Sequence, residues 1–302
     1  MHKVIRIGTR ESALAIWQAN TFQDLLTSKG YSSELIPIKS EGDLDLVQPL
    51  YEMGTTGIFT KTLDTALLND RIDLAIHSMK DVPTRLPEGI EQAAVLERGP
   101  VQDVIVQKTN VSSLQSHQKI ATGSLRRKAQ WLSKFPDHEI VPLRGNIQTR
   151  LSKLKNENWD GAIFAEAALV RLKLENKSVK ILGWMIPAPA QGALMIVCKS
   201  QNKALFNILK QFNKPETALC TQIERDFLRT LEGGCTAPIG ALATVEGDNI
   251  QFYGGVFSLD GKRKFIIKET FKKSSNQKGI KLAKQLLKKG AADLLQELKS
   301  SL

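Results

Sequence analysis

One of the three cysteines lies in a glycine-rich turn. Cys235 follows Gly233 and Gly234 in the stretch LEGGCTAPIG. A thiolate is a strong nucleophile, and glycine lets a backbone turn tightly. The other two cysteines, Cys198 and Cys220, fall on a predicted strand and a predicted helix face, where we expect them to be packing residues. Cys235 is therefore the thiol to which a chemical role can be assigned.

Arginines recur after predicted strands. They are Arg10 after KVIRI, Arg126 and Arg127 after IATGS, Arg144 after EIVPL, Arg150 in the following helix, and Arg171 in the helix after DGAIFA. In open α/β sheets, ligands bind outside the carboxyl ends of the strands, where helix N-termini also favour anions. Arginine adds planar donors suited to carboxylate or phosphate. The set predicts a site for a polyanion; the alternative is a set of solvent-exposed arginines at helix starts.

Strand–loop–helix units must position these side chains. KVIRI predicts a strand, residues 13–26 a helix, SELIPI a strand, IFTKTLDTALLND a helix and RIDLAIHS a strand. The same alternation restarts near residue 100 with KIAT, EIVPL and DGAIFA, each followed by a helix. Strands that alternate with helices are typical of parallel sheets in α/β folds.

The pattern changes after IPAPAQGALMIVCK. ALMIVCK predicts one more strand, and helices are expected near residues 203–212 and over ETALCTQIERDFLRTLEG. IGALATVE, IQFYGGVFS and RKFIIKETF then predict three strands joined by short turns, hence antiparallel, and a single helix from about 277 to 299 closes the chain. We therefore expect two α/β domains and one α+β domain.

Composition excludes several classes of function. The 302 residues carry a net charge of +11, and residues 262–302 alone hold twelve Lys or Arg against three acidic residues. We interpret this lysine-rich region as a solvated face rather than a nucleic-acid site, because it lacks interleaved aromatic residues. Neither a GxGxxG nor a GxxxxGK[ST] motif is present, and four histidines without metal-ligand spacing disfavour zinc. No signal-peptide pattern or apolar run of about 18 residues occurs, so we expect a cytoplasmic protein without membrane contact.

Five motifs together resemble the porphobilinogen deaminase (hydroxymethylbilane synthase) family. They are GTRESALAIWQ, IHSMKDVP, GSLRRKAQ, LRGNIQTRLSKL and LEGGCTAPIG, which occur in the family's order and span roughly residues 3–300. HSMKDVP and LEGGC are highly specific.

The resemblance implies two α/β domains like those of periplasmic binding proteins and a C-terminal α+β domain with a three-stranded antiparallel sheet. Domain 1 would comprise residues 1–97 and 194–214, domain 2 residues 98–193, and domain 3, with the cofactor-carrying cysteine, residues 215–302. It also implies a monomer without metal or nucleic acid.

The implied reaction condenses four porphobilinogen molecules, with loss of ammonia from each, into a linear tetrapyrrole. The family carries one covalent dipyrromethane per chain, held by a thioether to the cysteine that corresponds to Cys235. Every pyrrole bears an acetate and a propionate, so a growing chain accumulates carboxylates, which explains a set of arginines in physical terms.

The resemblance also implies roles for single residues. Asp81 in HSMKDVP matches the catalytic aspartate, although a residue capping the turn before Pro83 is the alternative. The positions that match cofactor or substrate contacts are Arg10, Ser12, Gln18, Phe59, Lys80, Thr122, Ser124, Arg126, Arg127, Arg144, Gly145, Arg150, Arg171 and Gln191. We expect His77 to be a satisfied structural histidine rather than a catalyst.

Some positions depart from the family pattern. Thr55 and Thr56 replace a common glycine and lysine, Gly123 a common serine and Ala190 a common glycine, and Glu166 lies in a stretch that is usually uncharged. A non-enzymatic binding protein for an anionic ligand, built on the same two-domain fold, remains the alternative function, and LEGGC counts against it.

Overall fold

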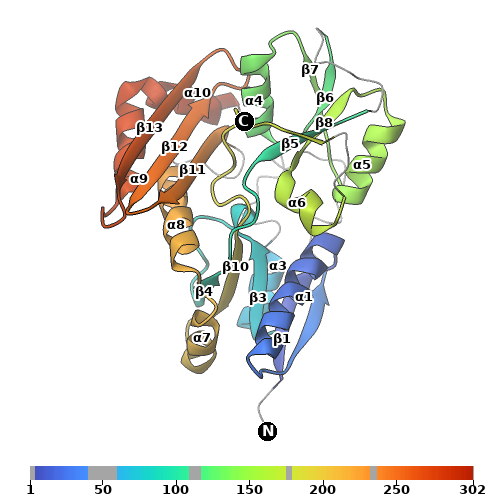
Figure 1. The fold of residues 1–302 in the computed structure, drawn as a ribbon, viewed down its shortest axis with the longest axis vertical. Helices are drawn as coiled ribbons and strands as arrows, with labels where there is room; N and C mark the ends of the chain where they lie inside the picture. Colours follow the sequence, from blue (N-terminus) through green and yellow to red (C-terminus); the bar gives the residue numbers. More distant parts are fainter. Residues whose placement is uncertain (1–3, 40–59, 109–116, 175–178, 232–236, 302) are drawn as a thin grey trace. The chain divides into compact units, whose positions relative to one another are not determined.

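The computed structural model describes residues 4–39, 60–108, 117–174, 179–231 and 237–301 (Figure 1). The described chain separates into two compact units. The first comprises residues 4–39, 60–99 and 192–219, and the second comprises residues 100–191 and 220–301 outside the gaps. None of the helices in these ranges is both long and apolar enough to span a membrane.

The first unit is built on a five-stranded sheet of order β2-β1-β3-β10-β4. Its strands are β1 (Ile5–Arg10), β2 (Ser33–Ile38), β3 (Leu74–Ser78), β4 (Ile90–Val95) and β10 (Leu194–Lys199). Its helices are α1 (Ala13–Ser28), α3 (Lys61–Leu68) and α7 (Lys203–Lys210), and a 3-10 turn spans Met79–Asp81.

Helices cover both faces of this sheet. Phe22 of α1 and Leu209 of α7 pack with Ile7, and the Phe22 and Phe212 rings meet edge to face with centroids 5.2 Å apart. Successive strand residues point to opposite faces, so Gly8 lies on the other side, where a Cβ atom would meet Leu63 of α3 and Ile72 of the segment between α3 and β3. Gly8 therefore allows α3 to approach the sheet closely.

The second unit contains a sheet of the same size, ordered β7-β6-β8-β5-β9. Its strands are β5 (Asp103–Gln107), β6 (Lys119–Ala121), β7 (Glu139–Val141), β8 (Gly161–Ala165) and β9 (Val179–Ile181). Its helices are α4 (Leu125–Lys134), α5 (Ile147–Asn156) and α6 (Glu166–Arg171).

The second unit also contains a three-stranded antiparallel sheet. It consists of β11 (Ile239–Glu246), β12 (Asn249–Phe257) and β13 (Lys264–Lys272), with β12 in the middle. The surrounding helices are α8 (Pro215–Thr230), α9 (Lys278–Leu286) and α10 (Ala292–Ser301). On one face, Phe227 of α8 packs edge to face on Phe252 of β12, with centroids 5.0 Å apart.

Close contacts join this sheet to α4 and to the segment before β10. Cβ atoms built on Gly240 and Gly261 would lie 2.8 Å from the Ile186 side chain and 2.3 Å from the Ser133 backbone nitrogen. The buried Glu224 of α8 accepts hydrogen bonds from the backbone N–H groups of Ala190 (2.6 Å) and Ala243 (2.7 Å). The assignment of residues 98–193 and 215–302 to separate domains stays a prediction.

The predicted fold class is confirmed: two α/β sheets accompany a three-stranded antiparallel sheet. The expectation that both α/β sheets are parallel is wrong in part. β10 runs antiparallel between β3 and β4, and β5 runs antiparallel to β8 and β9. The chain enters the second unit through β5 and re-enters the first sheet through β10, so neither strand follows the βαβ alternation that the prediction assumed.

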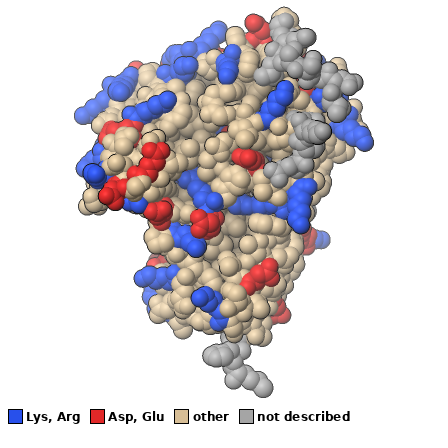
Figure 2. Space-filling view, viewed as in Figure 1, with Lys and Arg blue, Asp and Glu red and all other residues tan. Residues whose placement is uncertain are grey.

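The predicted C-terminal helix is also interrupted. A π-helical stretch, Leu287–Ala291, separates α9 from α10, and Gly290 has a φ of 103°. A Cβ atom there would lie 3.0 Å from the Phe265 ring, so glycine permits both the left-handed backbone and the close approach to β13. Lysine and arginine side chains gather over this region, at the upper left of Figure 2.

Candidate active site

Asp81 and Lys80 lie in the 3-10 turn that follows β3. Met79 anchors the turn, because its side chain is buried and its N–H donates to the Ala193 carbonyl at 3.0 Å. The Val82 N–H closes the turn on the Met79 carbonyl at 3.2 Å. This arrangement holds Lys80 and Asp81 half-buried at the end of a central strand.

Three further predicted residues belong to the same unit. Arg10 ends β1, and Ser12 caps α1 by accepting the Ala15 N–H at 3.3 Å. Gln18 is buried on α1 and donates to the Ser78 hydroxyl at 2.8 Å. A capping hydroxyl keeps its own proton as a donor, so Ser12 can cap α1 and still bind a ligand.

His77 lies next to this set and is 6% exposed. Burial, and secondarily the Arg10 cation, lower its pKa to about 4, so the imidazole is neutral near pH 7. Its Nε2 makes no hydrogen bond to the residues that the structure describes. The expectation of a satisfied histidine is wrong for Nε2 within the described residues, and the assignment of His77 as structural rather than catalytic stays a prediction.

The second unit presents a turn of hydroxyl groups before α4. Ser124 caps the helix by accepting the Arg127 N–H at 3.4 Å, and Thr122 accepts the Ser124 N–H at 3.3 Å. The side chain of Thr122 is buried, whereas that of Ser124 is half-buried. These contacts fix the N-terminus of α4, an end that favours an anion.

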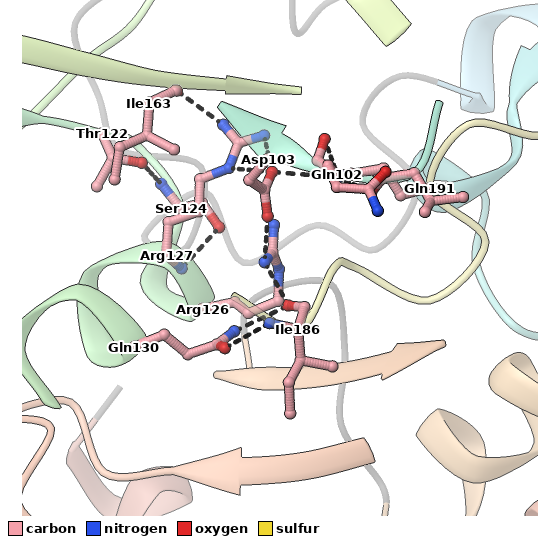
Figure 3. Close-up of polar contacts among 11 residues, drawn as sticks. Gln102, Asp103, Thr122, Ser124, Arg126, Arg127, Gln130, Ile163, Ile186 and Gln191 are labelled. Atoms are coloured by element: carbon pink, nitrogen blue, oxygen red, sulfur yellow. Dashed lines mark hydrogen bonds and ion pairs between the residues drawn. The ribbon is translucent and has the colours of Figure 1, made fainter. Parts of the chain in front are cut away.

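Arg126 and Arg127 begin α4, and both are buried (Figure 3). Arg126 Nη1 donates to Asp103 Oδ2 at 2.6 Å and to the Ile186 carbonyl at 2.7 Å. Arg127 donates from Nε to Asp103 Oδ1 at 3.0 Å and from Nη1 to the Ile163 carbonyl at 3.0 Å. Both predicted ligand residues thus converge on one aspartate.

The remaining arginines of this unit lie on two other elements. Arg144 is buried before α5, and Arg150 of α5 donates from Nε to the Gly145 carbonyl at 2.8 Å. Gly145 has a φ of 105°, and a Cβ atom there would lie 2.7 Å from Thr149 Cγ2. Arg171 ends α6, where burial lowers the pKa of its guanidinium to about 10.

Gln191 is buried in the same unit. Its Nε2 donates to the carbonyls of Val101 (2.8 Å) and Gln102 (3.2 Å) and to Asp103 Oδ1 (3.1 Å). Phe59 and Cys235 lie outside the described residues. Cys198 and Cys220 are buried, as expected of packing residues.

The predicted residues therefore form two groups. Arg10, Ser12, Gln18, Lys80 and Asp81 belong to the first unit, and the others that the structure describes belong to the second. Each group combines cationic and hydroxyl donors, the set that binds carboxylates. Among the described residues, no group of three or more His, Cys, Asp or Glu is arranged to hold a metal ion.

Two family models match the chain. Residues 5–207 match the "dipyromethane cofactor binding domain" of porphobilinogen deaminase, and residues 218–288 match its C-terminal domain. The chain belongs to the porphobilinogen deaminase family.

Curated relatives agree over the full length. The chain is 41% identical to a porphobilinogen deaminase of Chlorobium phaeobacteroides, over 100% of both proteins. It is 41% identical to that of Geotalea uraniireducens, over 98% of this chain and 95% of that protein, and 39% identical to that of Campylobacter fetus, over 96% and 97%.

Two solved structures show a weaker likeness to this chain. The Bordetella pertussis BvgS periplasmic VFT2 domain has a TM-score of 0.42 and 11% identity, with coverage of 70% of this chain and 86% of that one. The substrate-binding protein AbpA from Streptococcus pneumoniae, bound to L-arginine, has a TM-score of 0.38 and 14% identity, with coverage of 70% and 87%.

The structure bears on two departures from the porphobilinogen deaminase pattern: it shows why glycine is common at position 190 and why serine is disfavoured at position 123. Ala190 has a φ of 62°, a left-handed backbone that glycine adopts more readily. At Gly123, a Cβ atom would lie 2.5 Å from the Leu143 carbonyl oxygen, so a serine would require this backbone to shift. Glu166 is half-buried and begins α6, where a carboxylate is favourable beside the positive end of the helix dipole.

Asp103 is the residue of this site that the sequence motifs did not identify. It begins β5, a strand that the helix–strand alternation did not predict either, and it is fully buried. The available signal was an acidic residue directly before the apolar run VIV, since a carboxylate at the start of a buried strand needs cationic partners.

Proposed function

We propose that this chain deaminates four porphobilinogen molecules and joins them head to tail into hydroxymethylbilane, on a dipyrromethane primer bound through a thioether to Cys235. The observation that carries the proposal is the match of both family models, together with 41% identity over the whole chain. A non-enzymatic binding protein is disfavoured, because the C-terminal family domain and LEGGC are both present.

The described donors fit a ligand that bears several carboxylates. Arg126 and Ser124 lie at the N-terminus of α4, and Arg171 is a partly desolvated cation. A ligand carboxylate beside Arg171 would raise its lowered pKa, because an opposite charge favours the protonated guanidinium. Each pyrrole of the primer and the substrate carries two carboxylates, which these groups would hold.

Asp81 is the proposed acid–base residue. A half-buried carboxylate fixed at the end of a strand can bind the ammonium group of porphobilinogen and stabilise the cationic charge that forms as ammonia leaves. Lys80, on the same turn, would bind a carboxylate. When bound, the dipyrromethane supplies the pyrrole carbon to which the first substrate is joined.

The intact mass of the full-length protein tests the proposal. We expect the purified protein to carry a dipyrromethane adduct and the Cys235→Ser variant to be folded without it, because serine is a far weaker nucleophile than a thiolate. Cys220→Ser is the matched control and should keep the adduct. An adduct that persists on Cys235→Ser would contradict the attachment site, and wild-type protein that does not consume porphobilinogen would contradict the function. A monomeric, cytoplasmic enzyme is part of the same proposal.

A further inference from the structure

Asp103 joins three parts of the second unit (Figure 3). Its Oδ2 accepts from Arg126 Nη1 at 2.6 Å, and its Oδ1 lies 2.8 Å from Arg127 Nη2 and accepts from Gln191 Nε2 at 3.1 Å. The carboxylate is 0% exposed, so the donors from α4 and from the segment before β10 replace the water that it loses on folding.

The helix alone would not bring the two arginines together. Adjacent helical residues point about 100° apart, and side chains at i and i+1 do not face each other. Arg126 and Arg127 nevertheless contact the same carboxylate, one through each oxygen. Asp103, together with the Ile186 and Ile163 carbonyls, therefore restrains the directions of both guanidinium groups.

The two guanidinium groups are held in different ways. Arg127 uses Nε and Nη2 on Asp103 and Nη1 on the Ile163 carbonyl. Arg126 meets its described neighbours through Nη1 alone. The edge formed by Nε and Nη2 of Arg126 is the fork that binds a carboxylate in bidentate fashion.

A second contact restrains the same helix face. Gln130 lies one turn after Arg126, donates to the Ile186 carbonyl at 2.9 Å and accepts the Ile186 N–H at 2.7 Å. Arg126 donates to that same carbonyl. The Ile186 backbone therefore restrains both the helix that carries Arg126, through Gln130, and the guanidinium group of Arg126.

We propose that Asp103 is a positioning residue, which fixes Arg127 as a structural tie and turns the Nε–Nη2 edge of Arg126 toward a ligand carboxylate. The proposal rests on the proposed function, because the ligand is the dipyrromethane primer or the chain that grows on it. Asp103 itself does not contact the ligand. Its loss would misplace Arg126 and impair assembly of the covalent primer before it affects turnover.

The test compares full-length wild-type protein with Asp103→Asn, Asp103→Glu and the control Asp73→Asn. Asp73 of the first unit accepts hydrogen bonds from Arg6 Nε at 3.0 Å and Arg6 Nη2 at 2.9 Å. This is a comparable forked ion pair that lies outside the proposed site. For each protein, the melting temperature and the adduct-bearing fraction in the intact mass spectrum would be measured.

We expect both Asn variants to melt at lower temperature, but only Asp103→Asn to lose the adduct, by about tenfold or more. Asp103→Glu keeps the charge but displaces the oxygens by about one methylene group, so it should fold and also show a reduced adduct fraction. If Asp103→Asn does not fold, the adduct fraction of Asp103→Glu tests the positioning role instead.

A wild-type adduct fraction on folded Asp103→Asn or Asp103→Glu would overturn the inference. Adduct loss that follows melting temperature equally in Asp73→Asn and Asp103→Asn would do the same, because it would show a purely structural role. A wild-type chain without adduct would instead overturn the proposed function, and this inference with it.

Discussion

At the scale of single residues, Asp81 has the clearest expected phenotype. Replacement by Asn keeps the size of the side chain and the backbone turn that Met79 anchors. It removes the charge that we assign to the substrate ammonium, so the rate of condensation should fall about 10²-fold. Single-turnover kinetics with porphobilinogen measure this rate.

Asp70→Asn is the control for Asp81→Asn. Asp70 forms a surface ion pair with Lys199 at 2.9 Å, and its side chain is 76% exposed. Its loss should leave the rate unchanged. Wild-type single-turnover rates in Asp81→Asn would reduce Asp81 to a turn residue.

We expect the stability of the first unit to fall at acid pH because of His77. Its pKa of about 4 in the folded chain lies below the ordinary value of 6.5, so the unfolded chain binds the extra proton between these pH values. The stability that His77 contributes is present above pH 6.5 and is lost as the pH falls toward 4. The slope is about 1.4 kcal/mol per pH unit, for a total of roughly 3 kcal/mol.

Melting temperatures of wild-type protein and His77→Gln at pH 7, 5.5 and 4.5 test this dependence. The advantage of the wild type should shrink as the pH falls, because the variant lacks the titrating group. A constant difference between the two proteins would show that His77 does not control the acid response.

At the scale of elements, sequence periodicity was most successful where a strand and a helix are adjacent in the chain. α1 and β2 appear where the pattern predicted them. β4, β5 and β9 were missed, and the closing helix was predicted without its break at Gly290. These features depend on partners distant in sequence, such as β8 for β5 and Phe265 for Gly290, which local patterns do not encode.

The turn between β6 and α4 shows how backbone packing limits substitution. Gly123→Ser would place a Cβ atom 2.5 Å from the Leu143 carbonyl oxygen, a backbone atom that cannot move alone. We expect a loss of about 1–3 kcal/mol in the free energy of unfolding rather than a useful new hydroxyl. Gly183 provides the control, because a Cβ atom there would have no neighbour within 4 Å, and Gly183→Ser should change stability by less than about 0.5 kcal/mol. Equal denaturant midpoints for the two variants would refute the packing argument.

At the scale of the whole molecule, the sequence motifs predicted which residues bind carboxylates, but not what else holds those residues. Arg126 and Arg127 were expected to be ligand contacts alone. The structure adds a buried aspartate and two backbone carbonyls as partners, all from elements distant in the chain. The motif GSLRR contains no information on these partners, because they lie at Asp103, Ile163 and Ile186.

This difference predicts two classes of arginine variant. Arg126→Leu and Arg127→Leu would each deprive the buried Asp103 of one of its two cationic partners, which costs roughly 1–3 kcal/mol. Both variants should have a lower free energy of unfolding and should fail to assemble the primer. In Arg150→Leu, the side chain removed is half-buried and bonded through Nε to the Gly145 carbonyl, so we expect near-wild-type stability. Its defect should be in holding ligand carboxylates.

Native mass spectrometry after limited addition of porphobilinogen, combined with thermal melting, separates the two classes. Arg126→Leu and Arg127→Leu should show low melting temperatures and protein without bound pyrroles. Arg150→Leu should melt like the wild type and also fail to assemble the primer, whereas Arg144→Leu and Arg171→Leu should assemble it and accumulate partly elongated chains. If all five variants showed one common distribution of bound pyrroles, the arginines would act as an undifferentiated anion site. If Arg127→Leu matched the wild type in melting temperature, Asp103 would not depend on it.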